Sequence, residues 1–245
     1  TAGGEAVRWR TEAFRESGEV EVEDVEWTRR EVERFGAAVA DGSFSIGPRA
    51  FTGESFKVEM CAKADDIRVR SSHAFDWEGR LSGIVVARER TQDAVIPGVL
   101  PSAWQSPRAL FEYCLGEWEG RGTIVHRIPG SSERITSTLR LQYSLGGDLQ
   151  QTSSLSVVGG PSRKVQATAR LDHDRLSFAR AGVQMLLMPG GVSVAGPMVI
   201  ARGQPFVIEL GFLVRPDERI RIARCYNAQG AWINTVFISE RRKSR

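Results

Sequence analysis

Hydrophobic and polar residues alternate in short runs along most of the chain, with glycine, proline, serine or aspartate between the runs. Alternation with a period of two is typical of β-strands that bury one face. The first two runs, Val7 to Phe14 and Val20 to Trp27, flank the turn Glu16-Ser17-Gly18 and predict a hairpin. The segment from Thr28 to Phe35 suits a short helix or a strand, and a comparison with residues 174–181 favours a strand.

The second half of the chain carries a denser series of such runs behind one short helical segment. Ser106 and Pro107 suit the N-cap and the first position of a helix that ends near Cys114. About eight to ten short strands in roughly 130 residues are typical of an antiparallel barrel or sandwich, and closing a barrel removes exposed sheet edges. The predicted strands are Arg121–Ile128, Ile135–Ser144, Gln150–Val157, Lys164–Asp172, Arg175–Ala181, Val183–Met188, Val192–Val194, Phe206–Val214, Arg219–Tyr226 and Trp232–Ser239.

The residues from Asp41 to Arg90 recur, with substitutions, between Gly190 and Arg242. Two copies at so long a spacing indicate a duplicated domain and not a solenoid, whose units have about 20–50 residues. The matched positions are Gly47 with Gly196, Phe56–Met60 with Phe206–Leu210, Arg68 and Arg70 with Arg219 and Arg221, His73 with Arg224, Phe75 with Tyr226, Gly79 with Gly230, and Glu89 with Glu240.

This duplication predicts an all-β protein with two tandem antiparallel β-barrels. Prolines cluster between residues 91 and 107 and mark the boundary, so we predict a first barrel at 1–92, a linker with the helix start at 93–110, and a second barrel with a basic tail at 111–245. The stretch before the second copy is much longer than the stretch before the first. The first barrel is therefore expected to lack its opening strands, and because Thr1 is not a methionine, a segment is expected before it.

A Gly-x-Trp motif, Gly116-Glu117-Trp118, follows the predicted helix and opens the strands of the second half. This arrangement resembles the start of the calycins, the lipocalin-like superfamily of ligand-holding antiparallel barrels. Three further segments, Pro189–Val192, Phe206–Glu209 and Arg224–Trp232, resemble the C-terminal signature of an uncharacterised family from cyanobacteria and chloroplasts that has two calycin-like barrels in tandem. The resemblance implies that fold for both copies, and it implies a location in the chloroplast or the cyanobacterial cytoplasm.

The same resemblance implies structural roles for Trp118 and Arg224. In calycins a tryptophan at the closed end lies beneath an arginine from one of the last strands, whose planar guanidinium stacks on the indole. If the hairpin turns at Pro216-Asp217, Glu209 lies across from Arg224 and could pair with it. We interpret Trp118, Arg224 and Glu209 as residues that close the barrel. The repeated Glu59 and Glu209 have a second interpretation, as groups that read an amine or a propionate in the cavity.

Charge, apolar runs and cysteine spacing make several classes of function unfavourable. The net charge is +3, and basic residues are interleaved with acids except in the tail, which disfavours nucleic acid as a partner. No apolar run approaches the roughly 18–20 residues that cross a bilayer, so a membrane span is not expected. Cys61, Cys114 and Cys225 form neither a metal-ligand spacing nor an even disulfide set, which fits a reducing compartment.

No catalytic motif and no metal-ligand spacing occurs in the sequence, so we predict neither catalytic nor metal-binding residues. His73 stands where the second copy has Arg224; it either replaces that arginine at the barrel end or acts as a ligand or an acid–base group. The cysteines have two interpretations, as thioether links to a tetrapyrrole or as small buried apolar side chains. The second is favoured. Candidate contacts to a ligand or partner are Glu59, His73, Phe206, Phe212, Tyr226 and Trp232.

Two hypotheses on function follow. In the first, the protein binds a hydrophobic or tetrapyrrole-type ligand and takes part in pigment handling, because families related to the calycins include bilin lyases. In the second, it is a non-catalytic peripheral subunit or assembly factor of a photosynthetic complex and uses its barrels as docking surfaces. An open cavity of about 300 Å³ or more would be needed for a pigment-sized ligand.

Overall fold

The computed structural model describes residues 7–14, 20–27, 35–65, 67–90, 106–128, 131–172, 175–178, 183–188 and 190–243. Strands β1 (Val7–Phe14) and β2 (Val20–Trp27) form the predicted N-terminal hairpin in continuous antiparallel register. Most of the ambiguous segment 28–35 lies outside the described residues.

The first copy of the repeat and the strand before it form an open antiparallel sheet of five strands in sequence order. Asp41 and Gly42 form the two-residue reversal between the first two strands, and both adopt the positive φ that such hairpin turns require. The strands are β3 (Phe35–Ala40), β4 (Ser43–Pro48), β5 (Phe56–Ala64), β6 (Ile67–Phe75) and β7 (Leu81–Arg90).

The second half forms helix α2 (Pro107–Cys114) and a closed barrel of ten antiparallel strands. Ser106 caps the helix by accepting a hydrogen bond from the backbone N–H of Ala109, as its position predicts. Two tandem β domains are thus confirmed. The barrel strands are β8 (Gly116–His126), β9 (Ser132–Tyr143), β10 (Leu149–Val157), β11 (Ser162–Asp172), β12 (Arg175–Phe178), β13 (Val183–Met188), β14 (Val192–Pro197), β15 (Phe206–Arg215), β16 (Glu218–Tyr226) and β17 (Trp232–Arg242).

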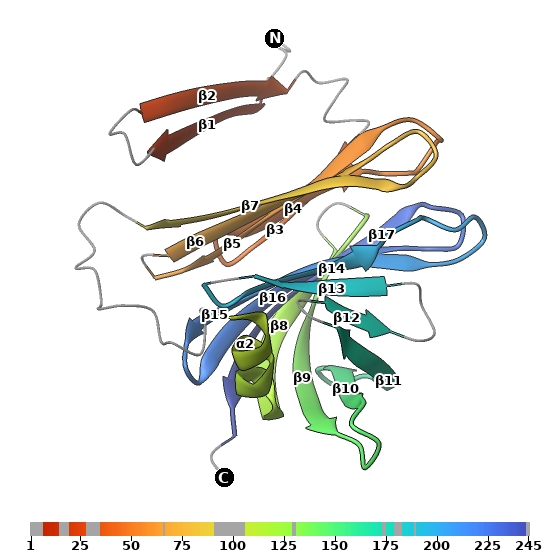
Figure 1. Cartoon of the computed structure of the whole chain (residues 1–245). Helices are drawn as coiled ribbons and strands as arrows, with labels where there is room; N and C mark the ends of the chain where they lie inside the picture. The colour runs from red at the N-terminus through yellow and green to blue at the C-terminus, as the bar shows by residue number, and fades with distance from the viewer. Residues whose placement is uncertain are drawn as a thin grey trace.

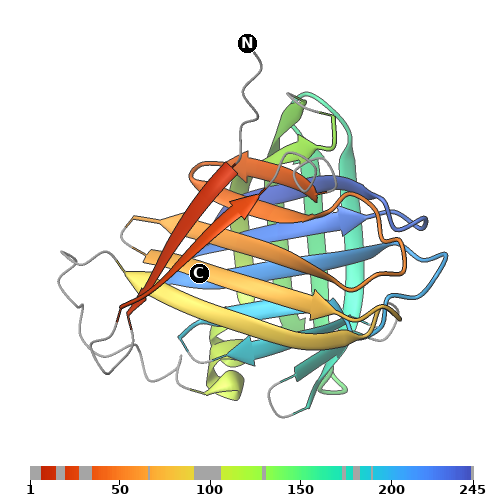
Figure 2. The same cartoon turned by 90° about the horizontal axis from the view of Figure 1, so that it is seen from above.

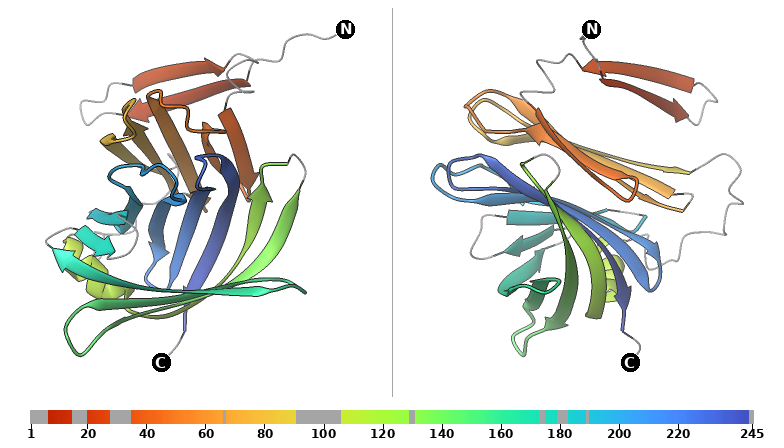
Figure 3. Two further views of the ribbon diagram at one scale, coloured as in Figure 1. Left: turned by 90° about the vertical axis from the view of Figure 1, so that its right-hand side faces the viewer. Right: turned by 180° about the vertical axis from the view of Figure 1, so that it is seen from behind.

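The five-stranded sheet packs face to face on one wall of the barrel, formed by β14 to β17 (Figure 1). Seen from above, the strands of the two layers run in nearly the same direction (Figure 2). On the other side, β8 to β11 curve away from the first sheet and close the barrel (Figure 3). The largest apolar core lies between the two layers and joins Val58 and Met60 of β5 to Ile208 and Leu210 of β15.

The two copies contact each other reciprocally, as the halves of a symmetric dimer do. The loop after β4 pairs with the β16–β17 turn through the bridge from Ala50 to Ala231, and the loop after β14 pairs with the β6–β7 turn through the bridge from Arg80 to Val199. The two bridges are equivalent, because Ala50 matches Val199 in the repeat and Arg80 matches Ala231. The duplicated sheets are therefore related by a pseudo-two-fold axis between the layers.

The apolar face of β15 differs from the simplest interpretation of its sequence. Phe206, Ile208, Leu210 and Phe212 alternate as the inner wall of a barrel would, yet their side chains belong to the core between the two layers. The opposite face of the same wall carries Glu209 and, on β16, charged residues that line the barrel interior. The first sheet buries the apolar face from outside, so the barrel wall has two buried faces.

Candidate functional site: the barrel interior and the sheet interface

A cluster of charged side chains lies inside the barrel, centred on Glu240 of β17. Glu240 is fully buried, and its carboxylate accepts hydrogen bonds from Ser137 Oγ at 2.9 Å and from Arg219 Nε at 2.6 Å. Arg221 Nε lies 3.2 Å from the same carboxylate. Burial alone raises the pKa of Glu240, but the two arginines and these hydrogen bonds hold the pKa below its usual value. The cluster keeps a buried carboxylate ionised.

A second acid extends this cluster across the barrel wall. Glu209 of β15 lies 3.5 Å from Arg221, which therefore sits between two carboxylates. Burial lowers the pKa of Arg221, while Glu240 and Glu209 together hold it above its usual value. Buried charges need such partners, because an unpaired charge away from water costs several kcal/mol.

The tryptophan of the Gly-x-Trp motif lies under two arginines, neither of which is Arg224. The guanidinium of Arg219 lies 4.3 Å from the centre of the Trp118 ring, and that of Arg242 lies 4.9 Å from it. The indole N–H donates to the carbonyl of Cys114 at 2.9 Å, at the end of α2. Trp118 thus joins the helix, β8, β16 and β17.

The expected contact between Arg224 and Trp118 is wrong. Arg224 and Arg219 stand on opposite faces of β16, because their numbers differ by an odd count and strand side chains alternate. The expected position of Glu209 across from Arg224 is also wrong by one residue. An irregularity between Leu213 and Arg215 shifts the β15–β16 register, so Glu209 lies opposite Ala223 and pairs with Arg221.

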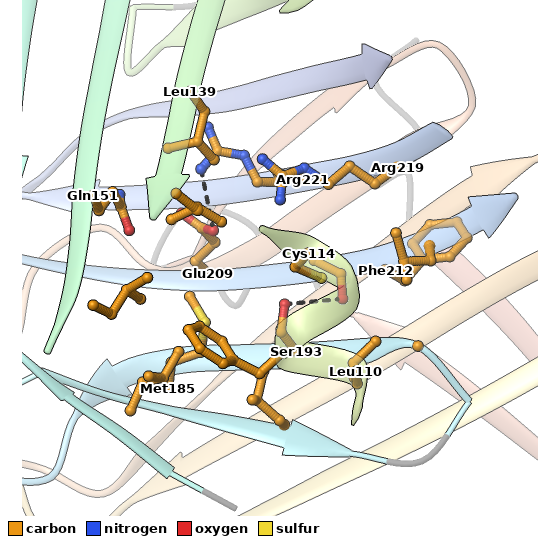
Figure 4. A pocket seen from close by; sticks show the side chains of 18 of the residues that line it. Leu110, Cys114, Leu139, Gln151, Met185, Ser193, Glu209, Phe212, Arg219 and Arg221 are labelled. Atoms are coloured by element: carbon orange, nitrogen blue, oxygen red, sulfur yellow. Dashed lines mark hydrogen bonds and ion pairs between the residues drawn. The ribbon is translucent and has the colours of Figure 1, made fainter. Parts of the chain in front are cut away.

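A small cavity lies beside the charged cluster, between α2 and the barrel wall (Figure 4). Its volume is about 60 Å³. Leu110, Leu139 and Met185 supply apolar lining, and Glu209 and Arg221 supply charge. A pocket for a drug-sized ligand has about 300–1,000 Å³. This cavity is too small for a tetrapyrrole in the conformation described.

Arg224 connects the two layers. It is fully buried, and its guanidinium donates hydrogen bonds to the carbonyl of Gly47 at 2.9 Å and to Tyr226 Oη at 2.8 Å. It also lies 4.3 Å from the centre of the Trp232 ring. Burial lowers the pKa of Arg224, and the contact with Tyr226 raises it in part. Arg224 is therefore an interface residue between the sheets and not a closing residue of the barrel floor.

His73 occupies the equivalent place in the other layer. A Cβ atom at Gly196 would lie 4.0 Å from the His73 ring, just as one at Gly47 would lie 3.1 Å from Arg224 Nε. The ring is fully buried, and neither nitrogen has a hydrogen-bond partner among the described residues. Burial lowers the pKa of His73 to about 4, so the ring is neutral at physiological pH.

The remaining predicted contact residues fall into two groups. Phe206, Phe212, Tyr226 and Trp232 are buried in the core between the layers, where Phe206 stacks on Tyr226 with ring centres 4.5 Å apart. Glu59 is half-buried on the outer face of the five-stranded sheet. The structure thus brings Arg224, Tyr226 and Trp232 together and separates them from Trp118 and Glu209.

Sequence reasoning did not assign roles to Arg219, Arg221 and Glu240, although it matched them to Arg68, Arg70 and Glu89 of the first copy. In the first copy Arg68 lies 3.6 Å from Glu89, and Arg70 lies 3.9 Å from the same carboxylate. The signal for an ionic cluster was that arginine and glutamate recur together at matched positions of both copies.

The cysteines lie apart and form no disulfide. Burial raises the pKa of Cys61 to about 11 and that of Cys225 to about 12, and it also raises the pKa of Cys114. These thiols are protonated at neutral pH, so they are poor nucleophiles. In the described part of the chain, no group of three or more histidine, cysteine, aspartate or glutamate side chains is placed to hold a metal, and no helix is long and apolar enough to cross a membrane.

Comparison with known proteins places this architecture in a family. The family model described as Biogenesis factor required for ATP synthase 1, C-terminal domain, matches residues 105–243, which hold the helix and the whole barrel. The chain belongs to this family. A comparison with curated proteins finds no match.

Solved structures extend the likeness to both layers. A protein of unknown function from the DUF3598 family of Nostoc punctiforme is 25% identical, with a TM-score of 0.75 over 96% of this chain and 82% of that one. The S-type phycobiliprotein lyase CPES from Guillardia theta is 12% identical, with a TM-score of 0.47 over 58% of this chain and 96% of that one. The β-barrel fold expected from the sequence is confirmed, and the finer assignment to the calycins stays a prediction.

Proposed function

We propose that this protein is a non-catalytic assembly factor that binds a polypeptide of ATP synthase during its biogenesis, in the chloroplast or the cyanobacterial cytoplasm. The observation that carries the proposal is the family match over the complete barrel, since the family is described as a biogenesis factor required for ATP synthase. This function is the docking hypothesis drawn from the sequence, with ATP synthase as the complex.

The barrel interior supports docking over pigment handling. Its centre holds the cluster of Glu240, Arg219 and Arg221, and the adjoining cavity has a volume of about 60 Å³. The apolar wall of β15 is covered by the first sheet. A polypeptide partner can dock on the outer surfaces of the two layers and needs no enclosed cavity.

Binding to separately purified ATP synthase subunits tests the proposal. The full chain is immobilised, and each subunit is titrated by biolayer interferometry at low and high salt. We expect saturable binding of at least one subunit. A parallel absorbance titration with a bilin is expected to show no saturable shift. A saturable shift with the bilin, together with no bound subunit, would replace the assembly function by pigment handling.

A further inference from the structure

Two arginines near the closed end of the barrel have buried N–H groups without acceptors. Arg219 is 7% exposed; its Nε donates to Glu240, but its Nη2 has no hydrogen-bond partner among the described residues. Arg242 stacks on the same Trp118 ring as Arg219, and its buried Nε and Nη2 also lack partners in the described part of the chain. Because a buried donor without an acceptor is costly, an acceptor from outside the chain would stabilise this region.

The cavity beside α2 gives space for such an acceptor. Arg219 lines it together with Arg221 of the same strand and Glu209 of the neighbouring strand. Leu110 of α2 and Met185 of β13 line the side away from these charges (Figure 4). The cavity is therefore charged towards β15 and β16 and apolar towards α2 and β13.

The volume of the cavity and the chemistry of its walls define the ligand. A cavity that holds one water has about 10–15 Å³, so a volume of about 60 Å³ accommodates about four to six non-hydrogen atoms. A guanidinium recognises a carboxylate through charge-assisted hydrogen bonds, and an apolar wall suits an alkyl chain. Acetate, propionate and butyrate combine these two groups within this size.

We propose that the barrel interior binds a short-chain monocarboxylate, for which propionate is the probe. The carboxylate accepts a hydrogen bond from Arg219 Nη2 and lies beside Arg221, and the alkyl chain packs against Leu110 and Met185. Glu209 on the same wall repels a second anionic group, so a dicarboxylate binds less well. The site is independent of the proposed function.

Methyl groups of methionine report on the cavity directly. The chain has four methionines, Met60, Met185, Met188 and Met198. Met185 lines the cavity, Met60 lies in the core between the layers, and Met198 is 37% exposed. In the full chain with carbon-13 methyl labels, sodium propionate should shift the Met185 resonance saturably and leave those of Met60 and Met198 in place. No saturable shift of Met185 relative to sodium chloride, or equal shifts of all three, would overturn the site.

A series of ligands tests the chemistry of recognition. Propionamide has the shape of propionate without its charge and should bind about tenfold more weakly or worse. Succinate and octanoate should also bind more weakly, because the first carries a second charge and the second exceeds the volume. Equal binding of propionamide would overturn recognition of a carboxylate, and equal effects of inorganic phosphate would leave an adventitious ion only. Tighter binding of octanoate would overturn the limit on chain length.

Two variants locate the ligand within the barrel. Arg219→Lys keeps a cation beside Glu240 but removes Nη2, and it should weaken propionate binding about tenfold or more. The matched control is Arg68→Lys, the same change at the matched position of the first copy, which should bind like the unaltered chain. Ser193→Leu adds volume inside the cavity, and the hydroxyl that it removes makes only a 3.5 Å hydrogen bond to the carbonyl of Gly211. If both cavity variants keep their melting temperatures and bind propionate as the unaltered chain does, the site is overturned.

The subunit titration separates this inference from the proposed function. A saturable response of Met185 without any bound ATP synthase subunit supports the carboxylate site and overturns the assembly function. A bound subunit without a response of Met185 to propionate leaves the assembly function standing and overturns the carboxylate site.

Discussion

Acidification should destabilise the fold through His73, which lies buried between the two layers. The neutral ring is the form that the interface accepts, because both nitrogens lack hydrogen-bond partners among the described residues and burial lowers the pKa to about 4 from an ordinary 6.5. The unfolded chain binds a proton below the ordinary value, and the folded chain does so only near the lowered one. Stability is therefore fully present above pH 6.5 and is lost as the pH falls towards 4.

The loss of stability on acidification follows from the difference between the ordinary pKa of His73 and its pKa in the folded protein. One pKa unit corresponds to about 1.4 kcal/mol, so the full loss is about 3 kcal/mol, of which about 2 kcal/mol is lost by a pH of about 5. That loss is a large part of the stability of an ordinary domain, about 5–15 kcal/mol. The assay is urea unfolding followed by tryptophan fluorescence at pH values of about 7.5, 6 and 5.

His73→Phe supplies the matched variant, since Phe75 already stands two positions along the same strand and an aromatic ring fits this core. At the lowest pH the variant should have lost about 2 kcal/mol less of its free energy of unfolding than the unaltered chain. His126→Gln is the control at a partly exposed histidine and should preserve the loss seen in the unaltered chain. An equal loss in His73→Phe and the unaltered chain would refute the assignment of the pH dependence to this ring.

Three further substitutions test the interface and the charged cluster by urea unfolding. Arg224→Ala removes hydrogen bonds and a ring contact between the layers and should lower the free energy of unfolding by about 2–4 kcal/mol, whereas Arg215→Ala at the surface should change it by less than about 0.5 kcal/mol. Glu240→Gln leaves buried Arg219 without its carboxylate and Arg221 with Glu209 alone, and should cost about 3–5 kcal/mol. This contribution should fade in the unaltered chain as the pH falls below 4.5, since the pKa of Glu240 is lowered. Gly36→Ala places a Cβ 2.4 Å from the Trp232 ring and should cost about 1–3 kcal/mol, whereas Gly83→Ala, with open space around it, should not. Equal effects of a substitution and its control would contradict the corresponding contact.

The strands and the duplication could be predicted from the sequence because both depend on local patterns. Alternation marked nearly every strand, and Ser106 with Pro107 marked the helix start. The repeat predicted that both copies form the same strand arrangement, and β4 to β7 pair in the same antiparallel order as β14 to β17. Predicting these features does not require knowing which layers pack against each other.

The inside of the barrel could not be predicted, because alternation gives two faces and does not say which one is the lumen. The face with Ile220 and Ile222 is the more apolar, so it suggests a barrel core, yet the charged face with Arg219 and Arg221 lines the interior. The first sheet supplies an outer layer that buries the apolar face, and the duplicated sequence alone does not show this packing. The register error at Glu209 has a local cause, since the irregularity near Val214 leaves no simple mark in composition.

The two copies carry the same ionic residues in different environments, and strand β8 accounts for the difference. Glu240 is fully buried because β8 closes the barrel beside it, with Gly120 directly against its side chain. Glu89, at the matched position of the open sheet, keeps 27% of its side chain exposed, and its distances to Arg68 and Arg70 are longer than those of Glu240 to its arginines. Exposed pairs contribute about 0–1 kcal/mol, whereas breaking a buried pair costs about 3–5 kcal/mol. The same three positions of the repeat therefore make a stabilising cluster inside the barrel of the second copy and a weak, solvent-screened one on the first sheet.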